Sequence, residues 1–322
     1  MRRIISASRR TDIPVFYGEW FMGRLKEGFV GVVNPYGGQK FILSLRPEDV
    51  TAIVFWSKNF GPFMENLEII ERMGYRFYFN YTVTSVPSVF EESVDRTAAI
   101  EALKRLSRTY SAKRINWRFD PIIVSSVSGR DFYVREFEAL ACELAGHVER
   151  CIFSFVTEYG KVKRNFDKLE RTTGVRVIRA SDEFKIELAN ELVEIAESYG
   201  IRMFSCCNDC LVGEKISKAR CVDGGIIEEL FYPEGISYSL KPTREQCGCA
   251  ESTDIGAYDT CPHGCIYCYA NTEAQRSKRA QERHDTESVF LGWSRSESEG
   301  WISEVGDGGT EAGGGKMELW SR

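Results

Sequence analysis

Three cysteines near the end of the chain have the type and spacing to bind iron. Cys261, Cys265 and Cys268 lie in the segment Cys-Pro-His-Gly-Cys-Ile-Tyr-Cys, which has the pattern CxxxCxxC. A loop with thiolates at these intervals can fold over one face of a cubane cluster and ligate three of its four irons. The fourth iron would then lack a protein ligand. The spacing therefore predicts a [4Fe-4S] cluster with one coordination position open to a small molecule.

Two other kinds of site also use cysteines at short intervals. Bacterial ferredoxins use CxxCxxC with a distant fourth cysteine, and structural zinc sites usually combine two CxxC-like pairs. The pattern CxxxCxxC matches neither rule cleanly. A non-catalytic iron–sulfur or zinc-binding protein, in which these cysteines are structural, stays open as an alternative.

The cysteine segment resembles the radical S-adenosylmethionine superfamily. The shared features are the spacing of the cysteines and an aromatic residue, Tyr267, directly before the last of them. The resemblance implies that the open iron chelates the amino and carboxylate groups of S-adenosylmethionine and donates an electron to it, which gives a 5′-deoxyadenosyl radical. It places Tyr267 beside the adenine. It also implies an unknown substrate and an electron donor such as a ferredoxin or flavodoxin.

Short β-rich runs alternate with helical runs from the first residue to about residue 260. This alternation predicts a mainly parallel sheet with helices outside, an α/β fold closed or partly closed into a (β/α) barrel of the TIM type over residues 1–275. A hairpin is expected from Phe29–Asn34 and Lys40–Leu45. The expected strands are Arg3–Ala7, Ala52–Trp56, Arg76–Thr82, Arg114–Phe119, Cys151–Val156, Ile201–Ser205 and Ile255–Asp259. The expected helices are Gly18–Lys26, Pro62–Arg72, Glu91–Ser107, Asp131–Ala145 and Asp182–Ser198.

Polar residues follow the carboxyl ends of the expected strands, where barrel enzymes build their sites. The last strand runs straight into the cysteine loop, so the strand ends would converge on one mouth. Taken singly, Asp12, Ser57 and Asp120 could instead cap helices, whereas the cations Arg9 and Lys58 are not what a helix N-terminus prefers. The sixth strand ends at Cys206 and Cys207. The polar residues that follow the first five expected strands are Ser6, Ser8, Arg9, Arg10, Asp12, Ser57, Lys58, Asn59, Asn80, Thr82, Arg118, Asp120, Ser154, Thr157 and Glu158.

Four motifs spread along the chain point to one family. They are Ile5-Ser-Ala-Ser-Arg-Arg-Thr-Asp-Ile-Pro14, Phe55-Trp-Ser-Lys-Asn59, Trp117-Arg-Phe-Asp-Pro121 and Asp254-Ile-Gly-Ala-Tyr-Asp-Thr-Cys-Pro-His-Gly-Cys-Ile-Tyr-Cys-Tyr-Ala-Asn271. With them, the stretch from Ile4 to about Asn271 resembles the family catalogued as domain of unknown function 1848. In a radical S-adenosylmethionine barrel, the unit of strand, cysteine loop and helix normally comes first in the chain. Here this unit comes last. The resemblance therefore implies a circularly permuted barrel, with the cluster loop on the C-terminal strand.

The Gly-Gly-Glu element, with which many superfamily members hold the cofactor amine, does not occur after an expected strand. Gly224 and Gly225 are followed by Ile226. Other polar groups would have to bind the cofactor, and the candidates are Asn80, Thr82, Arg118 and Glu158. Inside the loop, His263 could donate a hydrogen bond to a cluster sulfur or could simply be exposed.

Five further cysteines could form a second metal site. Cys206 and Cys207, at the end of the sixth strand, could join Cys221, Cys247 and Cys249. Four thiolates satisfy a closed iron–sulfur cluster or a tetrahedral zinc ion. Because the first site already requires iron, a second iron–sulfur cluster is favoured over zinc. Small buried hydrophobic side chains are the alternative.

Composition limits the compartment and the partners. The chain has 322 residues, a net charge of −5 and eleven cysteines. The acidic balance gives no general attraction to nucleic acid, although Lys161, Lys163 and Arg164 form a short basic run. A nucleic-acid repair lyase, similar in chemistry to the spore photoproduct lyases, is therefore a weaker alternative. No apolar run fits a signal peptide or a membrane span, and unpaired thiols fit a reducing cytoplasm.

The composition changes after about residue 275. The cysteine-rich segment 206–268 has ended, and Ser294–Gly315 is rich in Gly, Ser and Glu with few apolar residues. The stretch 276–322 is therefore expected to be a disordered tail beyond one residual helical turn.

Overall fold

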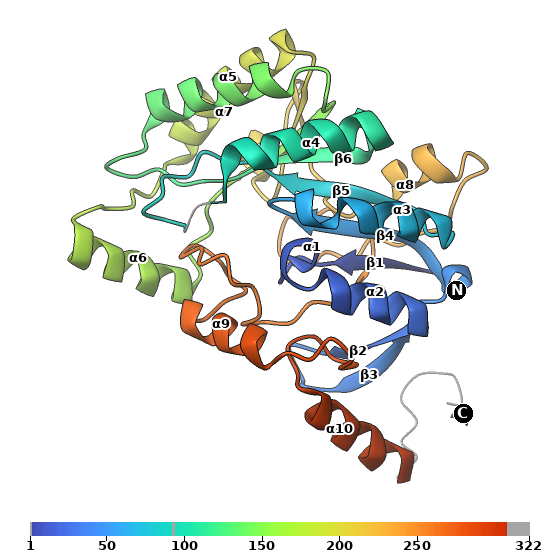
Figure 1. Cartoon of the computed structure of the whole chain (residues 1–322). Helices are drawn as coiled ribbons and strands as arrows, with labels where there is room; N and C mark the ends of the chain where they lie inside the picture. Colours follow the sequence, from blue (N-terminus) through green and yellow to red (C-terminus); the bar gives the residue numbers. More distant parts are fainter. Residues whose placement is uncertain (1, 92–93, 308–322) are drawn as a thin grey trace.

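The computed structural model describes residues 2–91 and 94–307, which form an α/β protein (Figure 1). The strands are β1 (Arg3–Ala7), β2 (Phe29–Val33), β3 (Lys40–Ser44), β4 (Val50–Ser57), β5 (Phe77–Thr82), β6 (Ile115–Ile122), β7 (Arg150–Phe155), β8 (Arg202–Ser205), β9 (Ile216–Lys218) and β10 (Thr253–Asp254). The α-helices are α1 (Ile13–Phe16), α2 (Gly18–Glu27), α3 (Met64–Arg72), α4 (Arg96–Tyr110), α5 (Arg130–Leu144), α6 (Gly160–Thr173), α7 (Asp182–Ser198), α8 (Gly224–Phe231), α9 (Ala274–Arg283) and α10 (Arg295–Asp307). Short 3₁₀ turns lie at Pro47–Asp49, Gly61–Phe63, Ala112–Arg114 and Asp209–Leu211.

Eight strands form one sheet in which every neighbouring pair is parallel. Their order is β10-β1-β4-β5-β6-β7-β8-β9. β1 and β10 come from opposite ends of the chain and pair through Ile5 with Thr253 and Ser6 with Asp254. Among the described residues no ladder joins the edge strands β9 and β10. The fold is therefore an α/β arrangement on a parallel sheet with two edges.

Most of the expected strands are present within one or two residues of their predicted bounds. The expected hairpin is also present, as the antiparallel pair of β2 and β3. β10 is a correction: it covers Thr253–Asp254, and residues 255–259 are loop. The sequence pattern does not predict β9, because three residues are too short to show an alternation.

The two faces of the sheet bury different side chains, because successive residues of a strand point to opposite sides. In β5, Phe77 and Phe79 belong to the large apolar core formed with α2, α3, α4, α5 and α7. Tyr78 faces the other side, which we call the inner face, where Ile226 and Ile227 of α8 pack. The inner face is the more polar one and buries Ser6, Asn80, Asn116, Arg118, Arg150 and Ser154.

Helix α6 is not among the helices expected from the sequence. The basic run that begins at Lys161 lies in this helix, whose buried residues Val162, Phe166 and Leu169 pack with apolar residues of the segments that follow β5 and β6. Their spacing of four and three residues is helical, but the charged residues around them hide the periodicity in the sequence. None of the helices in the described part of the chain combines the length and the apolar character that crossing a membrane requires.

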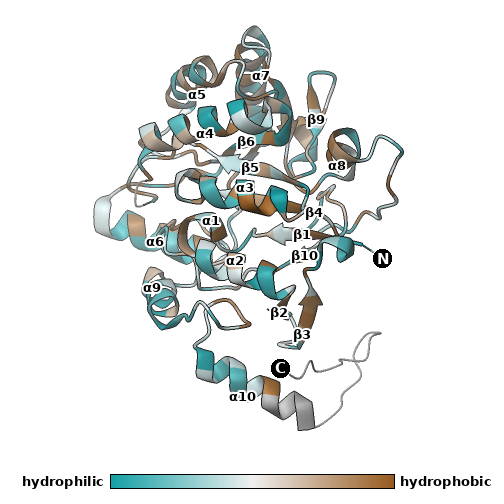
Figure 2. Cartoon of the chain, turned by 45° about the vertical axis from the view of Figure 1, so that its right-hand side comes forward, coloured by the Kyte–Doolittle hydropathy of each residue, from teal (hydrophilic) through white to brown (hydrophobic). Residues whose placement is uncertain are grey.

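Residues 274–307 are folded, which corrects the expectation of a disordered tail. Between α9 and α10, the Trp20 indole donates to the Ser288 carbonyl (2.8 Å) and the Gly31 amide donates to the Val289 carbonyl (2.9 Å). The Phe290 ring lies so close to Gly31 that a Cβ atom there would overlap it. Both α9 and α10 are mainly hydrophilic (Figure 2). The composition of this region therefore does not reveal the short buried segment around Phe290 that anchors it. The expectation for residues 308–322 falls outside the described residues.

His284 lies in this C-terminal part and is partly buried. Its Nδ1 accepts a hydrogen bond from the Gly292 amide (3.2 Å), and its ring meets those of Tyr17 and Trp20 edge-on. Its Nε2 is buried and has no hydrogen-bond partner among the described residues. Burial lowers the pKa of His284 below its ordinary value. The folded protein therefore favours the neutral imidazole.

The stability of the fold is expected to depend on this histidine in acid. As the pH falls below about 6.5, the unfolded chain takes up the proton more readily than the folded chain, so the free energy of unfolding falls. The His284→Gln variant, which does not titrate there, should lose less of this free energy between about pH 7.5 and about pH 5 than the unmodified chain. Urea denaturation at both pH values measures the difference. Equal losses in the two proteins would contradict it.

Candidate metal centre

The cysteine loop, residues 255–271, lies at the carboxyl edge of the parallel sheet. It follows directly from β10, which ends at Asp254. Figure 1 shows the orange segment before α9 at the end of the sheet toward which the arrow of β1 points. Side chains that follow the other parallel strands gather at the same edge. The loop therefore lies within reach of residues from several strands.

Hydrogen bonds from distant parts of the chain anchor this loop. The Tyr17 hydroxyl donates to the Thr260 carbonyl (2.7 Å). Further along, the Ile266 amide donates to the Phe90 carbonyl (3.0 Å), and the Asn165 side-chain amide donates to the Ile266 carbonyl (2.8 Å). Because three separate elements hold the loop, its cysteines have defined positions.

Asp254 joins the first and last strands beneath the loop. Its carboxylate accepts hydrogen bonds from the hydroxyls of Ser6 (2.7 Å) and Ser8 (2.8 Å) and from the Arg9 amide (2.8 Å). It also accepts from the amide of Gly256, two residues ahead (3.0 Å). This local turn, in which a side chain replaces a ladder partner, explains why β10 ends here.

Gly256 is expected to tolerate no side chain. A Cβ atom at this position would overlap the Ser8 hydroxyl and press against the Asp254 carboxylate. The Gly256→Ala substitution should therefore lower the free energy of unfolding by about 2 kcal/mol. Gly213, where a Cβ atom would meet nothing within 4 Å, provides the matched Gly→Ala control. Urea denaturation that gives both variants the same stability would rule out this close approach.

Asp12 connects the loop to β1 and β4. Its carboxylate caps α1 by accepting from the Val15 amide (3.2 Å), as the sequence allows. It also accepts from the Ser57 hydroxyl (2.8 Å) and the Lys58 amide (2.9 Å) at the end of β4. Nε2 of His263, in the loop, lies 2.7 Å from the same carboxylate. One buried side chain thus positions the start of α1, the end of β4 and the cysteine loop.

The position of His263 differs from both alternatives that the sequence leaves open. Its imidazole faces Asp12 and not a cysteine sulfur, and its side chain is only 11% exposed. The ring also meets Phe16 edge-on, with centroids 4.8 Å apart. His263 is therefore an anchor of the loop.

A buried ion pair lies beside Cys265. Lys58 Nζ is 2.5 Å from the Glu91 carboxylate, and the two side chains are 14% and 11% exposed. Lys58 also donates to the Tyr267 hydroxyl (3.0 Å), which itself donates to Glu91. The Cys265 thiol donates to the same carboxylate (3.6 Å). The pair thus ties the end of β4 to the middle of the loop.

Charge–charge contacts keep this pair ionised. Burial lowers the pKa of Lys58, but its interactions with the Cys265 sulfur and the Glu91 carboxylate outweigh burial and raise it overall. Burial raises the pKa of Glu91, and Lys58 outweighs that effect, so the net shift is downward. A cation therefore faces the cysteine loop from the sheet.

The three loop thiols are protonated in the metal-free chain at neutral pH. Burial raises the pKa of Cys265 to about 12, with Lys58 opposing and Glu91 adding to the effect. Burial also raises the pKa of Cys261 and of Cys268. Binding a metal through these sulfurs would therefore release protons.

Three of the residues expected to bind S-adenosylmethionine lie at or near the loop edge of the sheet. Tyr267 is in the loop, with its hydroxyl held by Glu91 and Lys58. Thr82 is the last residue of β5 and is partly exposed. Glu158 is exposed in the segment between β7 and α6. The structure gives these three residues no contact with one another.

Asn80 and Arg118 lie on the inner face and contact the second set of cysteines. The Asn80 side-chain amide donates to the Cys221 carbonyl (2.9 Å). Arg118 donates to the Cys221 sulfur (2.8 Å) and pairs with Asp120. Their polar groups are thus engaged with Cys221, which the sequence does not indicate.

The five cysteines expected to form a second site do meet on the inner face. Cys206 contacts both Cys207 (Sγ–Sγ 3.8 Å) and Cys221 (3.7 Å). Cys249 is near enough to Cys221 and Cys247, and Cys247 to Cys207, for these sulfurs to shift one another's pKa. As they stand, however, no three His, Cys, Asp or Glu side chains of residues 2–91 and 94–307 surround a metal position.

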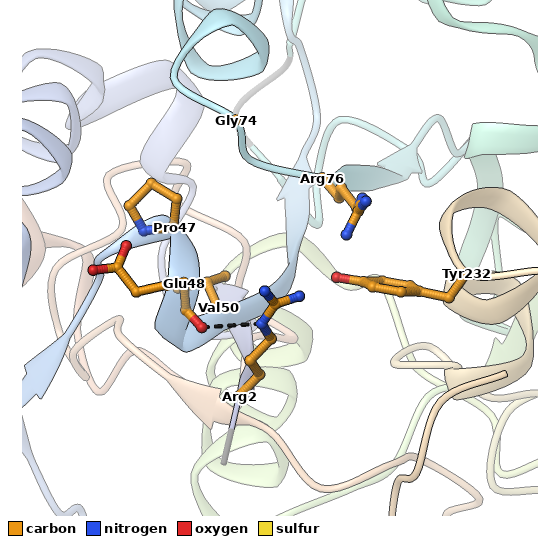
Figure 3. Close-up of a pocket in the computed structure, with 7 residues that line it drawn as sticks. All are labelled: Arg2, Pro47, Glu48, Val50, Gly74, Arg76 and Tyr232. Carbon is orange, nitrogen blue, oxygen red and sulfur yellow. Dashed lines mark hydrogen bonds between the residues drawn. The ribbon is translucent and has the colours of Figure 1, made fainter. Parts of the chain in front are cut away.

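A cavity of about 420 Å³ lies at the opposite edge of the sheet, away from both sets of cysteines. Figure 3 shows its lining, in which Arg2 donates to the Glu48 carbonyl (3.0 Å) and Arg76 faces the Tyr232 ring. These residues lie near the amino ends of β1, β4 and β5. Because sites on parallel sheets form at the carboxyl edge, this cavity is not part of the candidate centre.

The fold and the loop together define a class: an α/β protein with a parallel sheet and a cysteine loop at its carboxyl edge. The chain belongs to the family described as Domain of unknown function (DUF1848), whose model matches residues 4–270. The resemblance to domain of unknown function 1848 seen in the sequence is thereby confirmed. A search among curated proteins found no match. The match ends before α9 and includes all three cysteines of the loop.

The sequence does not reveal which side chains position the loop. Glu91 is expected in the first turn of a helix, but α4 begins at Arg96, and Glu91 turns instead toward Lys58. Asp12 stands among the polar residues that follow the first expected strand, and both Asp12 and Asp254 stand in the family motifs.

Proposed function

We propose that this chain is a radical S-adenosylmethionine enzyme that binds a [4Fe-4S] cluster through Cys261, Cys265 and Cys268. One observation carries the proposal: three thiols with CxxxCxxC spacing stand on a loop anchored at the carboxyl edge of a parallel sheet. At this edge a cofactor bound to the loop would lie against the ends of several strands. The family match covers the loop but assigns it no activity.

The donor set fits a cluster with three protein ligands. The other metal-binding groups beside the loop already have partners, since His263 is bonded to Asp12 and Glu91 is paired with Lys58. The loop therefore offers three thiols, and these neighbours do not provide a fourth ligand. When bound, such a cluster would supply the electron, received from a ferredoxin or flavodoxin, that cleaves S-adenosylmethionine reductively.

The surrounding residues are suited to orient the loop and keep water out. Lys58 brings a positive charge to the thiolates that a cluster requires, because its pKa stays raised beside Cys265. Ile266 and Tyr267 pack against an apolar cluster that includes Phe90 and, from α6, Phe166. One side of the loop is therefore shielded by hydrocarbon, and the other faces the polar strand ends.

We also propose that the sheet curls into a partial barrel around the inner face. Two contacts support the curvature. The Ala250 amide, ahead of β10, donates to the Val222 carbonyl, after β9 (2.9 Å). The Tyr78 hydroxyl, in the middle of the sheet, donates to the Cys221 carbonyl in the same region (2.8 Å). Both edges thus approach one another and the sheet centre, as in a (β/α) barrel.

The test is production of 5′-deoxyadenosine. The full chain is purified anaerobically, reconstituted with iron and sulfide, and supplied with dithionite and S-adenosylmethionine. We expect 5′-deoxyadenosine and methionine to form. The electron paramagnetic resonance spectrum of the reduced cluster should also change when S-adenosylmethionine is added, since the cofactor would bind the iron that lacks a protein ligand.

A non-catalytic iron–sulfur or zinc protein would behave differently. Its metal would be fully ligated by protein, so the spectrum would be the same with and without S-adenosylmethionine. A fully reconstituted cluster that yields no 5′-deoxyadenosine would overturn the proposed activity.

A further inference from the structure

We propose that the five cysteines on the inner face, which we call the inner cysteine group, bind a single tetrahedral metal ion of the zinc type. The group consists of Cys206, Cys207, Cys221, Cys247 and Cys249. This site is separate from the cysteine loop, and the inference does not depend on the proposed enzymatic function. It differs from the second iron–sulfur cluster that the sequence favours.

The inner cysteine group is assembled from three separate segments. Cys206 and Cys207 follow β8, Cys221 follows β9, and Cys247 and Cys249 precede β10. Three members, Cys206, Cys221 and Cys249, are at most 8% exposed. Isolated thiols buried as small hydrophobes would have no reason to converge from three segments, whereas ligands of one metal ion must do so.

The spacing of the sulfurs favours one ion over a cluster. Four thiolates at about 2.3 Å from a tetrahedral ion lie about 3.8 Å from each other. The Sγ–Sγ distances in the structure are 3.8 Å between Cys206 and Cys207 and 3.7 Å between Cys206 and Cys221. Thiolates on different irons of a cubane lie further apart, because sulfide and iron separate them. A modest opening of this group of sulfurs would admit one ion.

Two guanidinium groups contact the sulfurs directly. Arg118 donates to Cys221 (2.8 Å), and Arg244 donates to Cys207 (2.9 Å) and Cys206 (3.6 Å). Such contacts would be charge-assisted hydrogen bonds once metal binding turns these sulfurs into thiolates. A divalent ion with four thiolates has a net charge of about −2, which the two arginines would offset. Without a cation, adjacent thiolates would repel each other.

The backbone around the inner cysteine group is held in place. Cys207 has φ of 57°, in the left-handed region that a residue other than glycine rarely adopts. Strain of this kind persists where the surroundings hold a side chain in a required direction. The Cys221 carbonyl accepts from both Tyr78 (2.8 Å) and Asn80 (2.9 Å). The inner face therefore fixes Cys221 before any metal binds.

Metal analysis of the full-length chain tests the proposal. A variant with serine at Cys261, Cys265 and Cys268 lacks the loop thiols and keeps the inner cysteine group. We expect this variant to bind one zinc ion per chain and no iron. With Co²⁺ in place of zinc, it should show the intense thiolate-to-metal absorption of a tetrahedral cobalt site.

A second variant removes the inner site. In Cys221→Ser/Cys249→Ser only three cysteines of the group remain, too few for four thiolates whichever four are used. It should lose the zinc ion and the cobalt absorption. The matched control is Cys142→Ser/Cys210→Ser, which replaces two exposed cysteines outside both sets and should keep one zinc ion.

The outcomes separate the two sites. Zinc in the loop-serine variant and in the control, but not in the inner variant, would support the proposal even if no 5′-deoxyadenosine is ever formed. Iron with acid-labile sulfide in the loop-serine variant would overturn it in favour of a second cluster. No bound metal in that variant would overturn it in favour of free thiols. Because these results come from the loop-serine variant, a failure of the inner variant to fold leaves the test decisive.

Discussion

Serine in place of Cys265 is expected to remove the iron of the loop and to reduce 5′-deoxyadenosine formation to the level of an assay without protein. Cys265 is the middle one of the three proposed ligands, and its sulfur faces the Lys58–Glu91 pair (Cys265 Sγ to Glu91, 3.6 Å). A hydroxyl does not replace a thiolate as an iron ligand, and two remaining cysteines cannot hold a cubane by three irons. Iron and sulfide analysis together with the product assay measures both effects.

The matched control for this variant is Cys210→Ser. Cys210 is exposed and belongs to neither set of cysteines, so its replacement should leave iron content and product formation unchanged. Product formation by Cys265→Ser at the rate of the unmodified chain would mean that the loop is not the reactive centre.

Replacement of Asp12 by alanine is expected to lower the free energy of unfolding by about 3 kcal/mol, because several buried donors lose their acceptor. The Ser57 hydroxyl, the Lys58 amide and His263 all lose this partner in addition to the helix cap. Since His263 lies between two cysteines of the loop, iron incorporation should fall as well. Urea denaturation and iron analysis after reconstitution measure the two effects.

Asp95 provides a control that isolates the cap. Within the described part of the chain its carboxylate accepts only the Ala98 amide (3.0 Å), at the start of α4 and far from the loop in sequence. Asp95→Ala should cost about 1 kcal/mol and leave iron incorporation unchanged. If Asp12→Ala cost no more than Asp95→Ala and bound iron normally, Asp12 would be a helix cap and nothing more.

The strands could be predicted because local sequence determines them. In β5, Phe77 and Phe79 alternate with Tyr78 and Asn80, and this alternation is the signal that one strand has two differently buried faces. The cysteine loop was equally visible, since its three thiols lie within eight residues. Patterns of this kind involve only residues close together in the sequence, so they can be recognised without knowing the fold.

The supports of the loop could not be predicted in the same way. Lys58 meets Glu91 and Tyr267, and His263 meets Asp12 across an interval of 251 residues. Such contacts depend on which strands are neighbours and on which side chains are long enough to reach. The helices after residue 273 escaped prediction for a related reason. A buried anchor of a few residues, centred on Phe290, holds two otherwise hydrophilic helices.

The pairing of β1 with β10 has a consequence for the order of events during synthesis. β1 leaves the ribosome long before β10. Ser6 and Ser8 therefore lack their hydrogen-bond acceptor Asp254 while nearly 250 further residues are made. Until then one side of β1 has no strand beside it. The nascent chain cannot complete the proposed iron-binding site early, so a metal bound there would be delivered after translation of almost the whole polypeptide.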